Sequence, residues 1–142
     1  MAQDIIQKGT VTPAQMPTAQ RKKILIIEDD PFLSQMYFDK FVNEDFEVFV
    51  AHDGLEGLKM VNEKQVDLVI LDILIPKLSG VDLLTKIKED PKTKALPIIA
   101  LTNLTNVKEE YDVKNKGVNE YLIKSDYTPS QVVEIVKKHL PS

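Results

Sequence analysis

Three consecutive acidic residues are the first feature of this sequence that could do chemistry. Glu28, Asp29 and Asp30 follow directly on the apolar run ILII, residues 24–27, and Pro31 comes next. An apolar run that stops at charged residues is typical of a buried strand that reaches the surface. Two unit charges about 4 Å apart repel by about 4 kcal/mol at an effective dielectric of roughly 20. Acids held this close must therefore raise a pKa or hold a cation.

Polar side chains also stand at the ends of three later apolar runs. Asp72 ends the run VDLVILD, Thr102 follows the run LPIIAL, and Lys124 ends the run EYLIK. Carboxylates, a hydroxyl and an ammonium around one point suit phosphoryl transfer, in which a carboxylate is the nucleophile and cations neutralise the phosphoryl oxygens. Asp72 is the best candidate for the nucleophile if Glu28 and Asp29 are committed to a metal ion.

The elements that must bring these residues together can be read from the alternation of apolar runs with helical spacing. Five apolar runs predict strands, over residues 24–27, 46–51, 66–72, 96–101 and 120–124. Five helices are predicted between and after them, and their starts are marked by the N-cap residues Asp30, Asp53, Ser79, Asn106 and Thr128. This order predicts an α/β fold, with a five-stranded parallel sheet covered by five helices on both faces.

The strand order decides whether the polar residues meet. Right-handed crossovers leave few topologies, and the doubly wound, flavodoxin-like order 2-1-3-4-5 is one of two common solutions between which the pattern alone does not choose. In that order the first and third strands are neighbours, so Glu28, Asp29 and Asp72 would share one crevice at the carboxyl ends of the strands. An all-oxygen site without His or Cys favours a hard cation, Mg²⁺ or Mn²⁺.

Four motifs, IIEDD, LDILIPKLSG, IIALTN and EYLIK, resemble the receiver domain of the response regulators of bacterial two-component signalling. They stand in the family's order and spacing, and the resemblance covers about residues 22–140. It implies a CheY-like fold with the strand order 2-1-3-4-5 and a phosphorylation-dependent signalling switch. By this resemblance, Asp72 accepts a phosphoryl group from a sensor histidine kinase or a phosphotransfer protein, in a reaction that depends on Mg²⁺.

The resemblance also implies the metal ligands and the path of hydrolysis. Glu28, Asp29, Asp72 and the backbone carbonyl of Leu74 would hold the Mg²⁺ ion, with Glu28 acting through a water molecule. In receivers, the side chains two positions after the acceptor Asp and two after the Thr flank the water that attacks the phosphoryl group. Here these residues are Leu74 and Leu104. Neither can orient a water molecule, so we expect the phosphorylated form to hydrolyse slowly.

The switch residues follow from the same resemblance. Thr102 would bind a phosphoryl oxygen, Lys124 would pair with the phosphate, and Tyr121 would be the aromatic residue that rotates. A downstream protein would bind the face formed by the helix before the fifth strand, that strand and the last helix. Receivers usually carry a proline after the lysine, often in a cis bond, but Ser125 stands there in this chain. We expect a trans bond, because a non-proline cis bond costs ~2.5–4 kcal/mol.

Composition limits the other classes of function. The chain has 142 residues, 43% of them hydrophobic and 28% charged, which fits one globular domain. Its net charge of -4 argues against direct DNA binding, and the lack of cysteine excludes disulfides and thiolate sites. No apolar run approaches the ~20 residues that span a bilayer, and no secretory signal begins the chain, so we expect a cytoplasmic protein. Residues 1–20 are predicted to be a flexible tail, and residues 21–142 a single-domain receiver without an output domain.

Other functions and simple structural roles fit these residues less well. A Mg²⁺-dependent phosphohydrolase or nuclease on a similar fold would want D-x-D at one strand end, but LDIL has no second acid after Asp72. A binding module with a relic site would not need the whole set of acids, threonine and lysine. Taken alone, the acids could form a solvated loop with Asp30 as cap, and Tyr121 could be a half-buried strand residue. We therefore predict no enzyme in the usual sense, since the chain would catalyse only its own phosphorylation and dephosphorylation.

Overall fold

The structure is a computed structural model that describes residues 21–141. The predicted flexible tail, residues 1–20, lies outside the described residues, and so does Ser142. Five strands form one parallel sheet in the order β2-β1-β3-β4-β5, which confirms the predicted doubly wound topology. The strands are β1 (Lys23–Ile27), β2 (Glu47–Ala51), β3 (Leu68–Leu71), β4 (Ile98–Thr102) and β5 (Glu120–Ile123).

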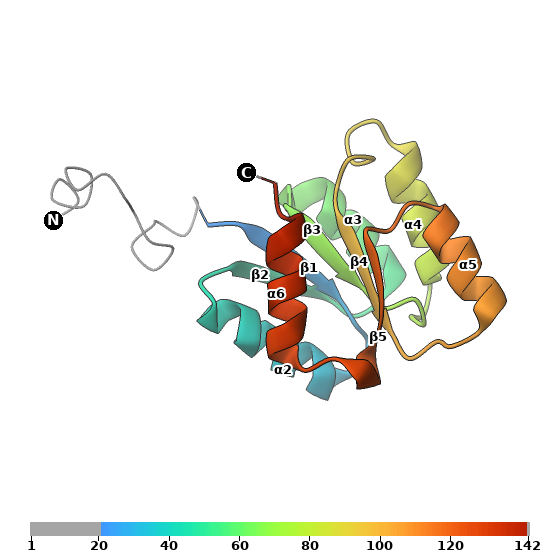
Figure 1. The fold of residues 1–142 in the computed structure, drawn as a ribbon. Coiled ribbons are helices and arrows are strands. Elements are labelled where there is room, and N and C mark those ends of the chain that lie inside the picture. The colour runs from blue at the N-terminus through green and yellow to red at the C-terminus, as the bar shows by residue number, and fades with distance from the viewer. Residues whose placement is uncertain (1–20, 142) are drawn as a thin grey trace, which may run out of the picture.

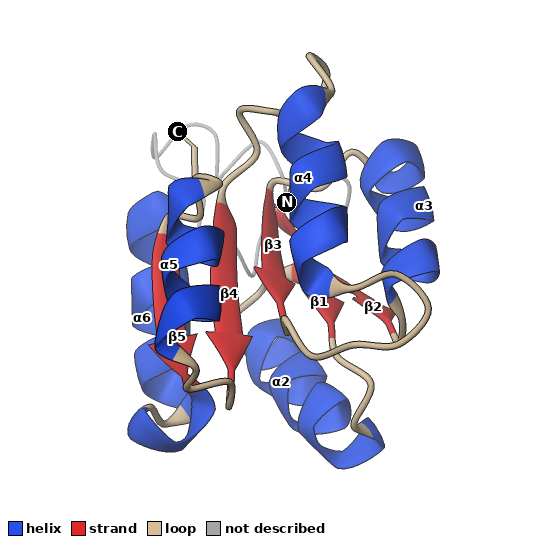
Figure 2. Ribbon diagram, turned by 90° about the vertical axis from the view of Figure 1, so that its right-hand side faces the viewer, coloured by secondary structure: helices blue, strands red, loops and turns tan. Residues whose placement is uncertain are grey.

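In the described part of the chain, five α-helices cover the sheet, two on one face and three on the other (Figure 1). The first face carries α2 (Pro31–Asn43) and α6 (Pro129–His139). Figure 2 shows the other face, with α3 (Gly54–Lys64), α4 (Gly80–Glu89) and α5 (Val107–Asn115) in front of the sheet. A short 3-10 helix, η3 (Lys124–Asp126), follows β5. Residues 21–141 contain no helix that is long and apolar enough to cross a membrane.

Side chains of the central strands alternate between the two layers of helices. In β1, Ile24 and Ile26 belong to the core cluster under α2 and α6, whereas Leu25 and Ile27 belong to the cluster under α3, α4 and α5. Every residue of β3 and β4 is buried. These strands appear in the sequence as nearly unbroken apolar runs because both of their faces are covered. The polar residues that follow them therefore stand at the edge of a packed core.

The predicted helix starts are present. The side chains of the five predicted caps each accept a backbone N–H of the helix that follows: Asp30, Asp53, Ser79, Asn106 and Thr128. Such caps satisfy donors at the first turn that have no partner within the helix. Gly117, just beyond α5, has a φ of 95°, in the left-handed region that glycine commonly adopts after the end of a helix.

The helical spacing of apolar residues in the sequence predicts that Met36 and Leu55 lie on the buried faces of their helices, but the structure exposes both. Met36 on α2 is 39% exposed and Leu55 on α3 is 55% exposed. Helical spacing grouped them with the buried residues of each helix, but a helix lying on a sheet buries only the narrow stripe that faces the strands. On α2 that stripe is formed by Tyr37 and Phe41, which pack against β1 and β3 in one cluster.

Candidate functional site

Three acidic side chains meet at the carboxyl ends of β1 and β3. The two strands pair in register, with Ile27 opposite Leu71, so the residues that follow, Glu28 and Asp72, come side by side. The N–H of Asp72 donates to the carbonyl of Ile27 at 3.0 Å. One carboxylate oxygen each of Glu28, Asp29 and Asp72 lies within 4.8 Å of the other two. The acids therefore share one crevice, with Glu28 and Asp72 buried and Asp29 exposed.

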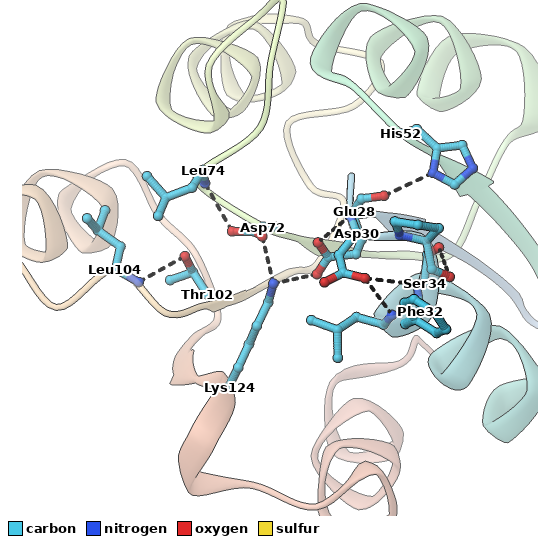
Figure 3. A network of polar contacts seen from close by, with 12 residues as sticks. Glu28, Asp30, Phe32, Ser34, His52, Asp72, Leu74, Thr102, Leu104 and Lys124 are labelled. Carbon is cyan, nitrogen blue, oxygen red and sulfur yellow. Dashed lines mark hydrogen bonds and ion pairs between the residues drawn. The ribbon is translucent and has the colours of Figure 1, made fainter.

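Lys124 places its ammonium between two of these carboxylates (Figure 3). Nζ lies 2.7 Å from Oδ2 of Asp72 and 2.5 Å from Oε1 of Glu28. The lysine begins η3 directly after β5, and its bond to Ser125 is trans, as predicted. The protein's own cation thus offsets part of the charge that the acids bring together.

The ionisation of the crevice reflects burial as well as charge. Burial raises the pKa of the Glu28 carboxyl, and although the hydrogen bond from Lys124 opposes this, the charge of Asp72 adds to it. Burial alone would lower the pKa of the Lys124 ammonium, but its hydrogen bonds to Asp72 and Glu28 outweigh burial and raise the pKa. Lys124 is therefore held charged while Glu28 is pushed towards protonation, as expected where two acids share one cation.

The loop after β3 supplies a second donor to Asp72. The backbone N–H of Leu74 donates to Oδ1 of Asp72 at 3.0 Å, so each oxygen of this carboxylate has a donor. The Leu74 side chain is 53% exposed and lies beside Asp72 in Figure 3. The use of the Leu74 carbonyl as a metal ligand stays a prediction.

A chain of hydrogen bonds links Thr102 to β5. The hydroxyl oxygen of Thr102, which is fully buried, accepts the N–H of Leu104 at 3.2 Å. The hydroxyl of Tyr121 donates to the carbonyl of Leu104 at 2.9 Å. Burial raises the pKa of the Tyr121 phenol, and the charges of Glu110 and Glu109 raise it further, so the hydroxyl keeps its proton. Thr102 and Tyr121 thus hold the loop after β4 from two directions.

The sequence shows no partner pattern for His139 or His52 and so predicts two surface residues, which misses one contact of His52 at the site. The residue is exposed, yet its ring Nδ1 lies 3.1 Å from the backbone carbonyl of Glu28. No local pattern marks this contact, since it joins the ends of two neighbouring strands across 24 residues of sequence. His139, also treated as a surface residue, has Nε2 2.7 Å from Oε2 of Glu120 at the start of β5.

The comparisons with known proteins agree on one family. The sequence profile of the family described as "Response regulator receiver domain" matches residues 24–137, which include all of the site residues described above. The chain is 36% identical over 115 residues to the uncharacterized transcriptional regulatory protein YclJ of Bacillus subtilis, which covers 81% of this chain and 49% of YclJ. The chain spans about half the length of YclJ and of other curated relatives that it matches.

Solved structures show the same fold. The crystal structure of a response regulator receiver domain protein from Methanospirillum hungatei matches with a TM-score of 0.78 and 25% identity, over 84% of this chain and 93% of that chain. The Mn²⁺-bound form of the response regulator Rcp1 matches with a TM-score of 0.74 and 25% identity, over 85% of this chain and 99% of that chain.

Proposed function

The chain belongs to the response regulator receiver domain family, and we propose that Asp72 is the residue that accepts the phosphoryl group in this member. Receiver domains are phosphoryl-accepting switches of two-component signalling rather than enzymes in the usual sense. The observation that carries the proposal is the place of Asp72 in the acidic crevice, with its Oδ2 2.7 Å from the Lys124 ammonium. The alternative of a Mg²⁺-dependent phosphohydrolase finds no support among these relatives.

The acceptor reaction would form one bond and break one bond at phosphorus. An oxygen of the Asp72 carboxylate attacks the phosphorus atom, and the bond from phosphorus to the donor breaks, which leaves an acyl phosphate on Asp72. The donor would be a phosphohistidine of a kinase or phosphotransfer protein, and its ring nitrogen leaves with the bonding electrons. Lys124 is close enough to Asp72 to neutralise a phosphoryl oxygen, and the Thr102 hydroxyl would donate to another.

A divalent cation fits the donor atoms of the crevice. Glu28, Asp29 and Asp72 offer three carboxylate oxygens within 4.8 Å of one another, and this cluster contains no His or Cys. Hard oxygen donors select Mg²⁺ or Mn²⁺, and the relative Rcp1 has a Mn²⁺-bound form. We propose that these carboxylates and the Leu74 carbonyl hold the ion, with Glu28 acting through water. Bound there, the ion would supply positive charge to the phosphoryl oxygens during transfer.

The response to phosphorylation would pass through Thr102 and Tyr121. A phosphoryl group on Asp72 offers new acceptors to the Thr102 hydroxyl, whose oxygen accepts the N–H of Leu104 in this structure. Any movement of Thr102 then acts on the loop to which the Tyr121 hydroxyl is also bonded. We expect the change to reach β5, α5 and α6, the face predicted to bind a downstream protein.

Labelling with a small phosphodonor tests the assignment. Acetyl phosphate and Mg²⁺ should phosphorylate the wild type, and mass spectrometry should locate the acyl phosphate on Asp72. Asp72→Asn and chelation of the metal by EDTA should each abolish the label, whereas Asp82→Asn, which changes an exposed acid on α4, should keep it. Label that survives in Asp72→Asn would place the acceptor on another residue.

The partners of this chain can be proposed only as classes of protein. Receiver domains exchange phosphoryl groups with histidine kinases or phosphotransfer proteins and act on downstream proteins. We propose the same for this chain, with catalysis limited to its own phosphorylation and dephosphorylation and without direct DNA binding by the residues of the receiver domain. The cytoplasmic location and the domain bounds 21–142 stay predictions.

A further inference from the structure

The turn between β2 and α3 contacts the acidic loop through His52. Its Nδ1 lies 3.1 Å from the backbone carbonyl oxygen of Glu28. A carbonyl oxygen only accepts, so Nδ1 carries a proton and donates it. The backbone N–H of Glu28 donates in turn to the carbonyl of Ala51 at 3.0 Å. Both backbone groups of Glu28 are therefore bonded to the end of β2 and to the residue that follows it.

The bond from His52 fixes the peptide group that joins two acids. The carbonyl of Glu28 and the N–H of Asp29 belong to one planar unit, so holding the carbonyl holds the whole plane. The Asp29 side chain is exposed, and among residues 21–141 no hydrogen bond or ion pair to its carboxylate is found. The backbone therefore sets the direction of its Cα–Cβ bond, and no side-chain bond of Asp29 adds to that constraint. Rotation of the peptide group would swing this carboxylate away from those of Glu28 and Asp72.

The turn that carries His52 is itself held from the other side. The backbone N–H of His52 donates to Oε1 of Glu56 at 2.8 Å. The N–H of Gly54 donates to the carbonyl of Pro76 at 3.1 Å, and a Cβ at Gly54 would lie 1.9 Å from the carbonyl oxygen of Leu78. Pro76 and Leu78 belong to the loop between β3 and α4, so the turn packs directly on that loop. His52 thus bonds to the acidic loop from a fixed support.

We infer that His52 is a positioning residue for the metal site, which orients Asp29 by fixing the peptide group between Glu28 and Asp29. The inference rests on the proposed function, since it concerns the ion that the acidic crevice would hold. His52 acts through the backbone of Glu28 and is not itself a ligand. Groups that orient the ligands of a metal commonly tune its affinity without touching it.

Two variants separate the hydrogen bond from the bulk of the side chain. His52→Asn keeps an N–H donor on an atom bonded to Cγ, the position that Nδ1 has in histidine. His52→Leu is close in size to the asparagine but has no donor. Because His52 is exposed, neither change empties the core, and we expect metal-free melting temperatures within ~2 °C of the wild type.

Calorimetric titration of the full chain with Mg²⁺ measures the effect. We expect His52→Leu to weaken Mg²⁺ binding about three- to tenfold, and His52→Asn to stay within about twofold of the wild type. In the metal-free protein, the NMR signal of the Asp29 amide should shift or broaden in His52→Leu and not in His52→Asn.

The possible outcomes distinguish the inference from the proposed function. Equal affinities in all three proteins would overturn the role of His52 and leave the metal site intact. An equal loss in both variants would also overturn it, because the donor would then not matter. Failure of the wild type to bind Mg²⁺ would overturn the proposed metal site, and the inference with it.

Discussion

Two helices on the same face of the sheet, α4 and α5, are anchored very differently (Figure 2). α4 buries Gly80, Leu83, Leu84 and Ile87, whereas α5 buries Val113 alone. The strands show the same contrast, since all four residues of β3 are buried but only Leu122 is buried among the four of β5.

The same contrast distinguishes the region of the acidic residues from the region of Tyr121. The acids stand at the ends of β1 and β3, on elements that are buried on both faces. Tyr121 lies on β5, beside the sparsely buried helix α5. Segments with few buried apolar contacts open at lower free energy than the core. In the proposed function, the acids that would hold the ion therefore lie on the well-packed side, and Tyr121, the predicted switch residue, lies on the side that opens at lower free energy.

Truncation of one core residue on each helix should give the largest effect. We expect Leu84→Ala on α4 to lower the free energy of unfolding by ~2–5 kcal/mol, because it removes three carbon atoms from a fully buried position. Val113→Ala on α5 removes fewer atoms and should lower it by ~1–2 kcal/mol. Urea denaturation monitored by circular dichroism measures both. Equal losses would mean that α5 is anchored as firmly as α4.

Leu74 and Leu104, the two leucines predicted to flank the attacking water, come from the two sides of this comparison. Leu74 is exposed on the acidic side, while Leu104 is half-buried and packs against the core cluster under α3, α4 and α5. We expect Leu74→Asn and Leu104→Glu each to speed loss of phosphate about three- to tenfold, because a polar group can orient the attacking water. Phosphate release after acetyl phosphate labelling gives the rates. Variants no faster than the wild type would show that these leucines do not limit hydrolysis.

Loss of the hydroxyl of Tyr121 tests how firmly the loop after β4 is tied to β5. Tyr121→Phe removes the bond to the carbonyl of Leu104 and should cost ~0.5–1.5 kcal/mol of stability. Tyr111→Phe, at a residue on α5 that is 64% exposed, is the matched control and should change little. Thermal denaturation compares the two. A control variant as unstable as Tyr121→Phe would argue that the lost bond is not the cause.

The smallest effect should be a pH dependence of the free energy of unfolding that comes from Glu28. The folded protein raises the pKa of Glu28 above its ordinary value of 4.5, so between those two values the folded state binds more protons than the unfolded state. In EDTA, this group should therefore lower stability as pH rises from about 4.5 through the folded pKa. Glu28→Gln should remove that decline, whereas Glu134→Gln, at an exposed residue of α6, should keep it. Unfolding curves at several pH values from 4 to 7 give the stability of each protein. If stability changed with pH equally in all three proteins, the decline could not be assigned to Glu28.

Strand ends and helix starts could be predicted because each depends on a few neighbouring residues. An apolar run that stops at Asp72 and a serine cap at residue 79 are local signals, and both elements lie where these signals put them. The strand order could not come from the pattern, since either common order buries the same runs; only the resemblance supplied it.

Contacts between distant residues were beyond the reach of the sequence. The resemblance implies that Lys124 pairs with a phosphate. In the structure the lysine bridges Glu28 and Asp72, and this depends on how η3 directs its side chain. The bond from His52 to Glu28 depends on the alignment of β2 with β1. Spacing along a helix likewise indicates which residues share one side of the helix. It does not indicate how wide a stripe the sheet covers, and Met36 lies outside that stripe.

The position of Lys124 in the chain has a consequence for the order in which the protein is made. The three acids lie within residues 28–72, and Lys124 follows Asp72 by 52 residues. On the ribosome the acids therefore emerge well before the lysine that pairs with Glu28 and Asp72, and N-terminal segments begin to fold first. A dissolved Mg²⁺ ion would offset part of their charge during that interval. We expect Mg²⁺ to speed refolding from urea, and to do so more in Lys124→Met than in the wild type. Stopped-flow refolding rates that do not change with Mg²⁺ concentration in either protein would refute this.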